Sequence, residues 1–386
     1  MVRSAFGYRA EITTWSDDRP VQTVELAEPD WEPALQWSYF QQIRAGARQP
    51  MMRCLDGCIE PVWDPALGQP FVSALRVRPG ARRAAARSVA IEIPTRYLRP
   101  AVEHAASRLV TEGRLVAGEP FRFRVVAGPA PSLERRLPGH DDGVHAVPIA
   151  HRLPIAAASI ARLGASAERD AIAADPVDLR VVVHASVLEA AVSLAAATPD
   201  AEAGGVLVGA LCRDVDDGDL FLDVRALLPA RHAVAQPDRL TFTPETWADA
   251  HAAIALRGND ECFVGWAHSH PFFCRDCTPA ARRTCALALP FFSEQDRSLH
   301  RTVFGRPFDV ALLVSDGGPS GHSCALFGWR RGMIERRGYS VAGHTAAASS
   351  PATPSSPARS DDGPGVAPRL SESRSTCGGR DARAPD

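Results

Sequence analysis

Two histidines separated by a single residue constrain this chain more than any other feature. His268 and His270 end an apolar run that begins at Glu261. Side chains alternate along a strand, so residues two apart point to the same side. We therefore expect residues 261–270 to form a strand that delivers two imidazoles to one divalent metal ion. Ser269, between them, should face away from that metal, and we assign it no catalytic role.

Two further segments supply the groups that such a metal site needs. Ser293-Glu-Gln-Asp296 follows the histidines, and the carboxylate of Asp296 would complete a site with three protein ligands and one water. Upstream, Glu202 precedes the apolar stretch Gly204-Gly-Val-Leu-Val-Gly209, which has the composition of a buried strand. Along the chain, the order is therefore a carboxylate, two histidines and a second carboxylate.

Taken together, these residues resemble the JAMM (MPN+/JAB) family of zinc metallopeptidases. That family combines a Glu before a Gly-Gly-x-Leu-x-Gly strand, then His-x-His-Pro, then Ser-x-x-Asp, and this chain carries all the polar elements in that order. The resemblance covers residues 178–340. It implies an α/β fold of the cytidine-deaminase-like type, with a mixed sheet flanked by helices.

The resemblance also implies a role for each polar side chain. His268, His270 and Asp296 would hold a catalytic Zn²⁺, and Glu202 would be the general acid and base. The Ser293 hydroxyl would stabilise the oxyanion of the tetrahedral intermediate. Ser293 also stands where a residue could cap the helix that carries Asp296, and the two roles can coexist.

The implied reaction is hydrolysis of a peptide or isopeptide bond after the C-terminal glycine of a ubiquitin-like protein, by deconjugation or precursor trimming. The implied partners are a ubiquitin-like protein or its conjugates, together with enzymes of the conjugation pathway. One alternative is a catalytically inactive scaffold that binds partners. Another is a peptidase that acts on small peptides or sulfur-carrier precursors. A zinc deaminase is disfavoured, because the motif lacks the His-x-Glu of that chemistry.

The chain departs from the family pattern between its second histidine and Ser293. Residues 271–292 intervene, whereas the family has about seven residues there. This insertion contains cysteines at spacings typical of a structural zinc site, for which we consider His300, or else Cys262, as the fourth ligand. The alternative is three reduced thiols in a flexible loop. In either case we expect the loop to lie at the mouth of the site and to gate substrate entry or read the partner through its arginines. The three cysteines are Cys274, Cys277 and Cys285.

Composition limits the function classes. A net charge of −2 over 386 residues gives no basis for a nucleic-acid or membrane-surface protein. The first residues lack the apolar run of a signal peptide, and nine cysteines favour thiols and metal ligands over a disulfide framework. We therefore expect a cytoplasmic protein. All 43 basic residues are arginine. Genomic composition accounts for this most simply, and the alternative is selection against acceptor lysines.

Four regions are expected along the chain. Residues 1–128 predict an α+β module of unknown role, with recognition as one hypothesis, and residues 129–176 a linker with a short helix near 155–163. Residues 177–340 form the metallopeptidase domain, and residues 341–386 a disordered tail. In the first module, helices should follow Asp30 and a capping Thr95, and the expected strands are 9–15, 21–25, 71–77, 89–93 and 121–126.

In the metallopeptidase domain, helices should run from a capping Ser186 to Ala197 and from Pro244 to about Leu256. Besides the histidine strand, the alternation of apolar runs and turns predicts five strands. They are 179–183, 204–212, 220–228, 308–315 and 324–330.

Overall fold

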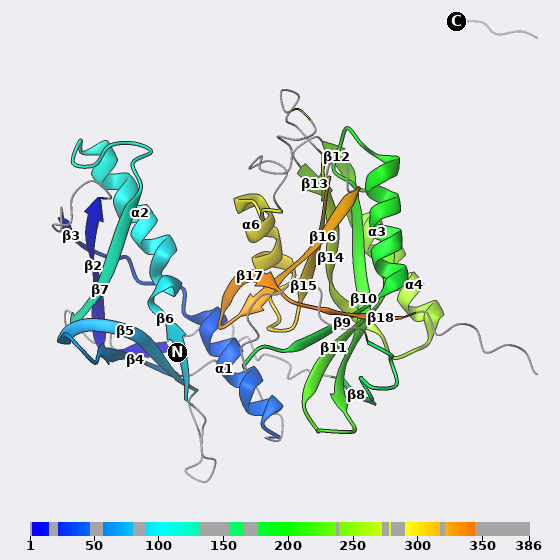
Figure 1. The fold of residues 1–386 in the computed structure, drawn as a ribbon, viewed down its shortest axis with the longest axis horizontal. Helices are drawn as coiled ribbons and strands as arrows, with labels where there is room; N and C mark the ends of the chain where they lie inside the picture. Colours follow the sequence, from blue (N-terminus) through cyan, green and yellow to red (C-terminus); the bar gives the residue numbers. More distant parts are fainter. Residues whose placement is uncertain are drawn as a thin grey trace, which may run out of the picture. The chain divides into compact units, whose positions relative to one another are not determined.

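The structure is a computed structural model, and it describes residues 2–14, 22–46, 57–79, 90–130, 154–165, 177–236, 239–271, 278, 290–316 and 321–343. Residues 1–345 belong to one compact unit. The described part is mixed α/β, as expected, and contains two large sheets (Figure 1). The predicted disordered tail, residues 341–386, lies outside the described residues except at its start. There the prediction is wrong, because Val341 and Ala342 are buried in the strand β18 (Ser340–Ala342).

The first sheet is built from the N-terminal third of the chain. Its strands follow the order β1-β4-β5-β7-β2-β3, with β6 paired to β5. α1 (Glu32–Arg44) and α2 (Arg99–Thr111) provide its helices. The strands are β1 (Val2–Ser4), β2 (Phe6–Thr14), β3 (Gln22–Glu25), β4 (Gly57–Asp64), β5 (Gly68–Pro79), β6 (Ile91–Pro94) and β7 (Phe121–Pro129).

Both expected N-terminal helices are present, but one starts differently. The Asp30 carboxylate accepts the Glu32 N–H at 3.0 Å just before α1. Thr95 begins a short 3₁₀ turn that ends at Leu98, and no side chain caps α2, which starts at Arg99. The prediction of Thr95 as the cap is therefore wrong. Pro100 explains the delay, since proline is best accommodated in the first turn of a helix, where no N–H is needed.

The second sheet has the order β17-β16-β15-β14-β10-β11-β9-β18, with β8 also paired to β10. β14 runs antiparallel to β10 and parallel to β15, so the sheet is mixed. Its strands are β8 (Ile155–Ala158), β9 (Arg180–His184), β10 (Gly204–Asp214), β11 (Leu220–Pro229), β14 (Cys262–His270), β15 (Val310–Asp316), β16 (His322–Arg330), β17 (Met333–Arg337) and β18 (Ser340–Ala342).

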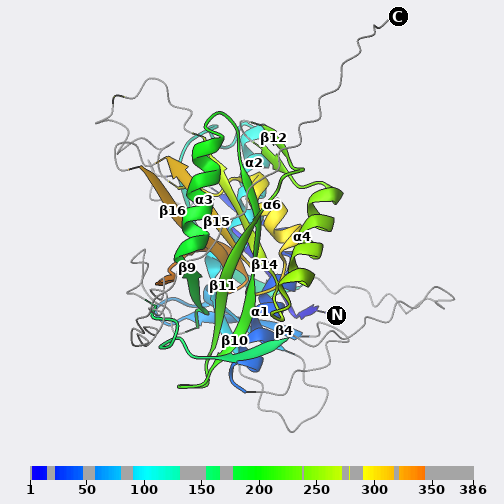
Figure 2. The same cartoon turned by 90° about the vertical axis from the view of Figure 1, so that its right-hand side faces the viewer.

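Helices flank the second sheet on both faces, and Figure 2 shows α3 on one side with α4 and α6 on the other. α3 (Ala185–Ala197) buries two larger apolar residues, Val187 and Leu188, and two alanines in a cluster with β9, β11 and β14. α4 (Pro244–Arg257) and α6 (Glu294–Val303) meet the opposite face through aromatic side chains. Trp247 of α4, for example, has its ring 6.0 Å from that of Phe304.

The expected helix near 155–163 is wrong, because the structure has a strand there. Ile155–Ala158 pairs in parallel with Leu211–Asp214. β14 pairs with β10 only as far as Gly209, which leaves this part of the β10 edge to be covered. A short apolar segment gains a row of backbone hydrogen bonds by adding to that edge, whereas an isolated helical turn is costly to nucleate.

Ser186 is not the cap of α3. His184 occupies the N-cap position with an extended backbone and makes no side-chain cap bond. Its Nε2 instead lies 3.0 Å from an oxygen of the buried Asp223. Thr243 does cap α4, accepting the Thr246 N–H, and Pro244 fills the first turn as predicted.

Helix α1 contacts both sheets. Phe40 and Ile43 belong to the core of the second sheet, and the Phe40 ring lies 6.2 Å from that of Phe308. Ala34 sits against Gly332, where a Cβ would come within 2.8 Å of the Ala34 Cα. The left-handed φ of 78° at Gly332 adds a second reason for glycine.

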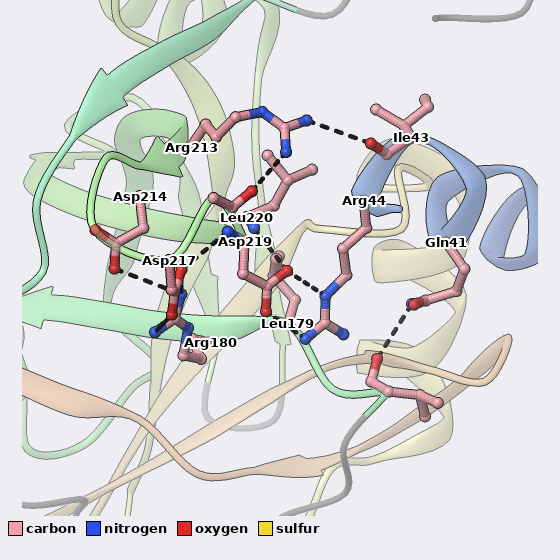
Figure 3. Close-up of polar contacts among 12 residues, drawn as sticks. Gln41, Ile43, Arg44, Leu179, Arg180, Arg213, Asp214, Asp217, Asp219 and Leu220 are labelled. Atoms are coloured by element: carbon pink, nitrogen blue, oxygen red, sulfur yellow. Dashed lines mark hydrogen bonds and ion pairs between the residues drawn. The ribbon is translucent and has the colours of Figure 1, made fainter. Parts of the chain in front are cut away.

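Polar contacts close the same junction (Figure 3). Arg44 holds the Asp219 carboxylate through two bonds of 2.7 Å, and Gln41 donates to the Val177 carbonyl at 3.1 Å. Burial alone would raise the pKa of Asp219, but the bonds from Arg44 and the Leu220 N–H lower it overall. The N-terminal region is therefore fastened to the second sheet by packing and by a charge-assisted, two-pronged bond.

No helix of the described residues is long and apolar enough to cross a membrane.

Candidate metal centre

The two histidines stand at the end of β14, as the strand prediction required. The His268 side chain is fully buried, and its ring stacks on that of Trp266 with centroids 4.3 Å apart and planes 12° apart. His270 is partly exposed and lies 4.8 Å from the ring of Phe291. The Nε2 atoms of the two histidines are 3.1 Å apart, so both rings present the same nitrogen to one point.

Asp296 reaches the same point from α6. Its Oδ1 lies 3.2 Å from His268 Nε2, and its Oδ2 lies 3.5 Å from His270 Nε2. Ser293 caps this helix, and its Oγ accepts the Asp296 N–H at 3.1 Å. In return, the Ser293 N–H donates to Asp296 Oδ2 at 2.7 Å, which completes a capping box. The predicted cap is therefore confirmed, and it also orients the carboxylate.

The spacing of these atoms fits a single metal ion. Donors about 2.0–2.1 Å from a tetrahedral ion are separated from one another by about 3.3 Å. The separations of 3.1, 3.2 and 3.5 Å lie around that value. The ligand atoms of His268, His270 and Asp296 all lie within 4.8 Å of one another. Two imidazoles and a carboxylate form a donor set that suits zinc.

The protonation states also favour a cation. Burial lowers the pKa of His268, so its ring is neutral. Burial would raise the pKa of Asp296, but hydrogen bonds involving His268 and His270 outweigh it and hold that pKa well below its usual range. A neutral imidazole and an ionised carboxylate are the forms that bind metals.

Among the described residues, aromatic contacts, and not hydrogen bonds, surround the far sides of the two histidine rings. Metal-binding histidines usually donate their second N–H to a carboxylate or carbonyl. Within the described part of the chain, neither His268 Nδ1 nor His270 Nδ1 has a hydrogen-bond partner. Aromatic side chains therefore pack against both rings: Trp266 and Phe292 beside His268, and Phe291 beside His270.

Glu202 approaches the centre from the segment before β10. Its side chain is largely buried, and Oε1 lies 3.8 Å from His270 Nε2, outside the tight group of ligand atoms. The Glu202 N–H donates to the Gln236 carbonyl of β12 (Val234–Gln236) at 2.9 Å. This position beside the ligands, but not among them, is where a proton-transfer group is needed.

Ser269 has a role that sequence reasoning missed. Its Oγ accepts the Ala203 N–H at 2.9 Å, and its own N–H donates to the Ala203 carbonyl at 2.8 Å. It therefore links the histidine strand to the residue after Glu202. Strand alternation correctly separated Ser269 from the ligands but carried no information about which segment lies beside it.

A cavity of about 420 Å³ adjoins the centre. Glu202 and Asp296 line it at the candidate metal centre, and β13 (Arg239–Thr241), α4 and α6 form its walls. Its lining combines six aromatic or aliphatic residues with seven polar or charged ones, so it can contact both apolar and polar parts of a ligand. The walls include Phe242, Trp247, Trp266, Leu240, Leu299 and Val303.

The proposed second zinc site stays a prediction. Cys274, Cys277 and Cys285 lie outside the described residues. His300 is fully buried, and its Nδ1 accepts the Trp266 indole N–H at 3.2 Å, so only Nε2 remains for a ligand role. Cys262, the other candidate, starts β14 at the end opposite to His270, and burial raises the pKa of its thiol.

No protein-family model matches this chain, and no curated protein matches it. Among solved structures, the chain is similar to the solution structure of protein DSY2949 from Desulfitobacterium hafniense. The identity is 21%, the match covers 42% of this chain and 92% of that one, and the TM-score is 0.29. The functional argument therefore depends on the residues of the site itself.

Proposed function

We propose that this protein is a zinc-dependent metallopeptidase of the JAMM type. Its proposed reaction is hydrolysis of the bond after the C-terminal glycine of a ubiquitin-like protein. The observation that supports this best is the convergence of His268, His270 and Asp296 at tetrahedral spacing, with Glu202 beside them. The complete donor set favours an enzyme over an inactive scaffold, since a scaffold has no need of a buried carboxylate at 3.8 Å from a ligand.

A zinc ion held by these three side chains would act as a Lewis acid and lower the pKa of a bound water. Glu202 would accept a proton as the water oxygen adds to the carbonyl carbon. It would then return that proton to the leaving amine as the C–N bond breaks. The Ser293 hydroxyl accepts one bond from the Asp296 N–H and keeps its own proton to donate to the developing oxyanion.

The surroundings of the cavity suit an extended, narrow substrate. β13 lies on its wall and, among the described strands, pairs only with β12. A peptide tail could add to its other edge by backbone hydrogen bonds. The apolar lining would contact the tail's side chains, while a Gly-Gly end would pass the metal ligands. These features suit an extended peptide segment as substrate.

The substitution Glu202→Gln tests the proposal. It should leave the zinc content and the thermal midpoint unchanged, because Glu202 is not a ligand, while hydrolysis of a ubiquitin–lysine-peptide conjugate falls by about 100-fold or more. The matched control is Glu294→Gln, because Glu294 is 94% exposed at the start of α6. A wild type that binds conjugates without cleaving them, or a Glu202→Gln variant of full activity, would contradict the proposal.

A further inference from the structure

The strand pair that carries the metal site ends with an unusual exchange of hydrogen bonds. Gly204 pairs with His268 and Gly205 with Ala267, so Ala203 lies opposite Ser269. In an antiparallel pair of this kind, each residue normally donates its N–H to the other's carbonyl. Ser269 does donate to the Ala203 carbonyl, at 2.8 Å. The return bond from the Ala203 N–H goes to the Ser269 hydroxyl at 2.9 Å.

This substitution of a hydroxyl for a carbonyl occurs where the chain leaves the sheet. Gly204 fits closely against β14, since a Cβ there would lie 2.0 Å from the Ala267 carbonyl oxygen. Two residues earlier, the chain carries Glu202, whose N–H is held by Gln236 of a different sheet. The Ser269 hydroxyl therefore bridges the point at which the strands diverge.

The bond is part-buried, and the side chains on either side of it are buried. Ser269 and Glu202 are each 5% exposed, whereas Ala203 itself is partly exposed. An N–H that loses its acceptor where water has little access costs up to about 1–3 kcal/mol, unless the chain moves to find another. Removal of the hydroxyl therefore favours a shift of residues 202–203, and a shift of about 1 Å in a catalytic group is enough to slow a reaction by about 100-fold.

We propose that Ser269 is a positioning residue that fixes Glu202 relative to the metal-binding histidines. It acts through the backbone of Ala203 and does not touch the substrate. Three consecutive residues of β14 then carry the two proposed ligands and, between them, the hydroxyl that holds the segment of Glu202. The distance from the ligands to Glu202 is therefore fixed by this one short stretch of strand. This inference rests on the proposed function, because Glu202 needs a fixed position only if it transfers protons.

The test compares Ser269→Ala with Ser269→Thr, which keeps the hydroxyl. With a ubiquitin–lysine-peptide conjugate, Ser269→Ala should lower kcat by about 100-fold with little change in KM, and Ser269→Thr should restore most of it. Zinc affinity, measured against a chelator, should be the same in all three proteins. Ser315→Ala is the matched control, since Ser315 is buried on the neighbouring strand and its hydroxyl has no partner within the described residues.

Hydrogen exchange gives a second readout that does not need a substrate. The amide of Ala203 should exchange faster in Ser269→Ala than in the wild type or in Ser269→Thr. Unchanged kcat in Ser269→Ala, or a matching loss of zinc affinity, would overturn the proposal. If the wild type itself hydrolyses nothing, the proposed function fails. The hydrogen-exchange rate of the Ala203 amide then tests the positioning role alone. Faster exchange in Ser269→Ala supports that role, and an unchanged rate overturns it.

Discussion

His300 shows how strongly one buried side chain can couple stability to pH. It lies in an aromatic layer with Phe292, Phe304 and Trp329, and burial lowers its pKa to about 3. The folded protein therefore keeps the ring neutral, while the unfolded chain binds a proton below the ordinary pKa of about 6.5. Its contribution to stability is complete above that pH and is lost as the pH falls from about 6.5 toward 3.

The free energy of unfolding should accordingly drop between pH 7 and pH 5, by about 2 kcal/mol from His300 alone. Urea titrations at the two pH values measure this. In His300→Gln, which keeps an acceptor for the Trp266 N–H, the drop should be smaller by that amount. An equal drop in both proteins would show that His300 does not titrate in this way.

At the scale of single elements, the N-cap residue of α6 has an observed structural role and a proposed chemical one. Ser293 caps the helix through the Asp296 N–H, and that helix delivers the Asp296 ligand. The same hydroxyl is the proposed oxyanion donor. The two roles can be separated because glycine is a good N-cap and alanine a poor one, although neither has a hydroxyl.

Ser293→Ala should therefore lower the free energy of unfolding by about 1 kcal/mol, and Ser293→Gly by only a few tenths. Hydrolysis should fall in both variants to a similar extent, because both lose the hydroxyl. Thermal or urea unfolding with parallel rate measurements distinguishes the roles. Activity that follows stability, with Ser293→Gly close to the wild type, would reduce Ser293 to a cap.

Local sequence signals predicted the elements that build the site, and the exceptions have physical reasons. The His-x-His spacing and the Ser-x-x-Asp spacing each describe one element, so β14 and the cap of α6 could be read directly. β8 could not, because whether Ile155–Ala158 forms a strand depends on the free edge of β10. The hydrogen-bond partner of Ser269 could not be predicted either, because Ala203 is 66 residues away in sequence and only the folded sheet brings the two together.

On the scale of the whole molecule, α1 makes the N-terminal region part of the framework of the second sheet. Phe40 is 2% exposed and packs with Phe308 and other core residues of that sheet. Arg44 and Gln41 add polar contacts at the same junction. Helix α1 lies within the predicted region 1–128 and supplies core residues to the sheet of the predicted region 177–340.

Phe40→Ala should lower the free energy of unfolding by about 3–5 kcal/mol, the usual cost of removing a buried phenylalanine. Gln36→Ala on the same helix, whose side chain donates to Glu32 in an exposed contact, should have little effect. Urea unfolding followed by tryptophan fluorescence measures both. A loss well below 1 kcal/mol in Phe40→Ala would mean that α1 is not packed in the core.

The central claim, one zinc ion held by His268, His270 and Asp296, is tested most directly by anomalous diffraction at the zinc absorption edge. Crystals of the zinc-loaded protein should give an anomalous peak about 2 Å from both Nε2 atoms and from the Asp296 carboxylate. The measurement locates the metal, so a second ion at the cysteines would not be mistaken for this one. The account is contradicted if these crystals show no peak at this point, or zinc only elsewhere.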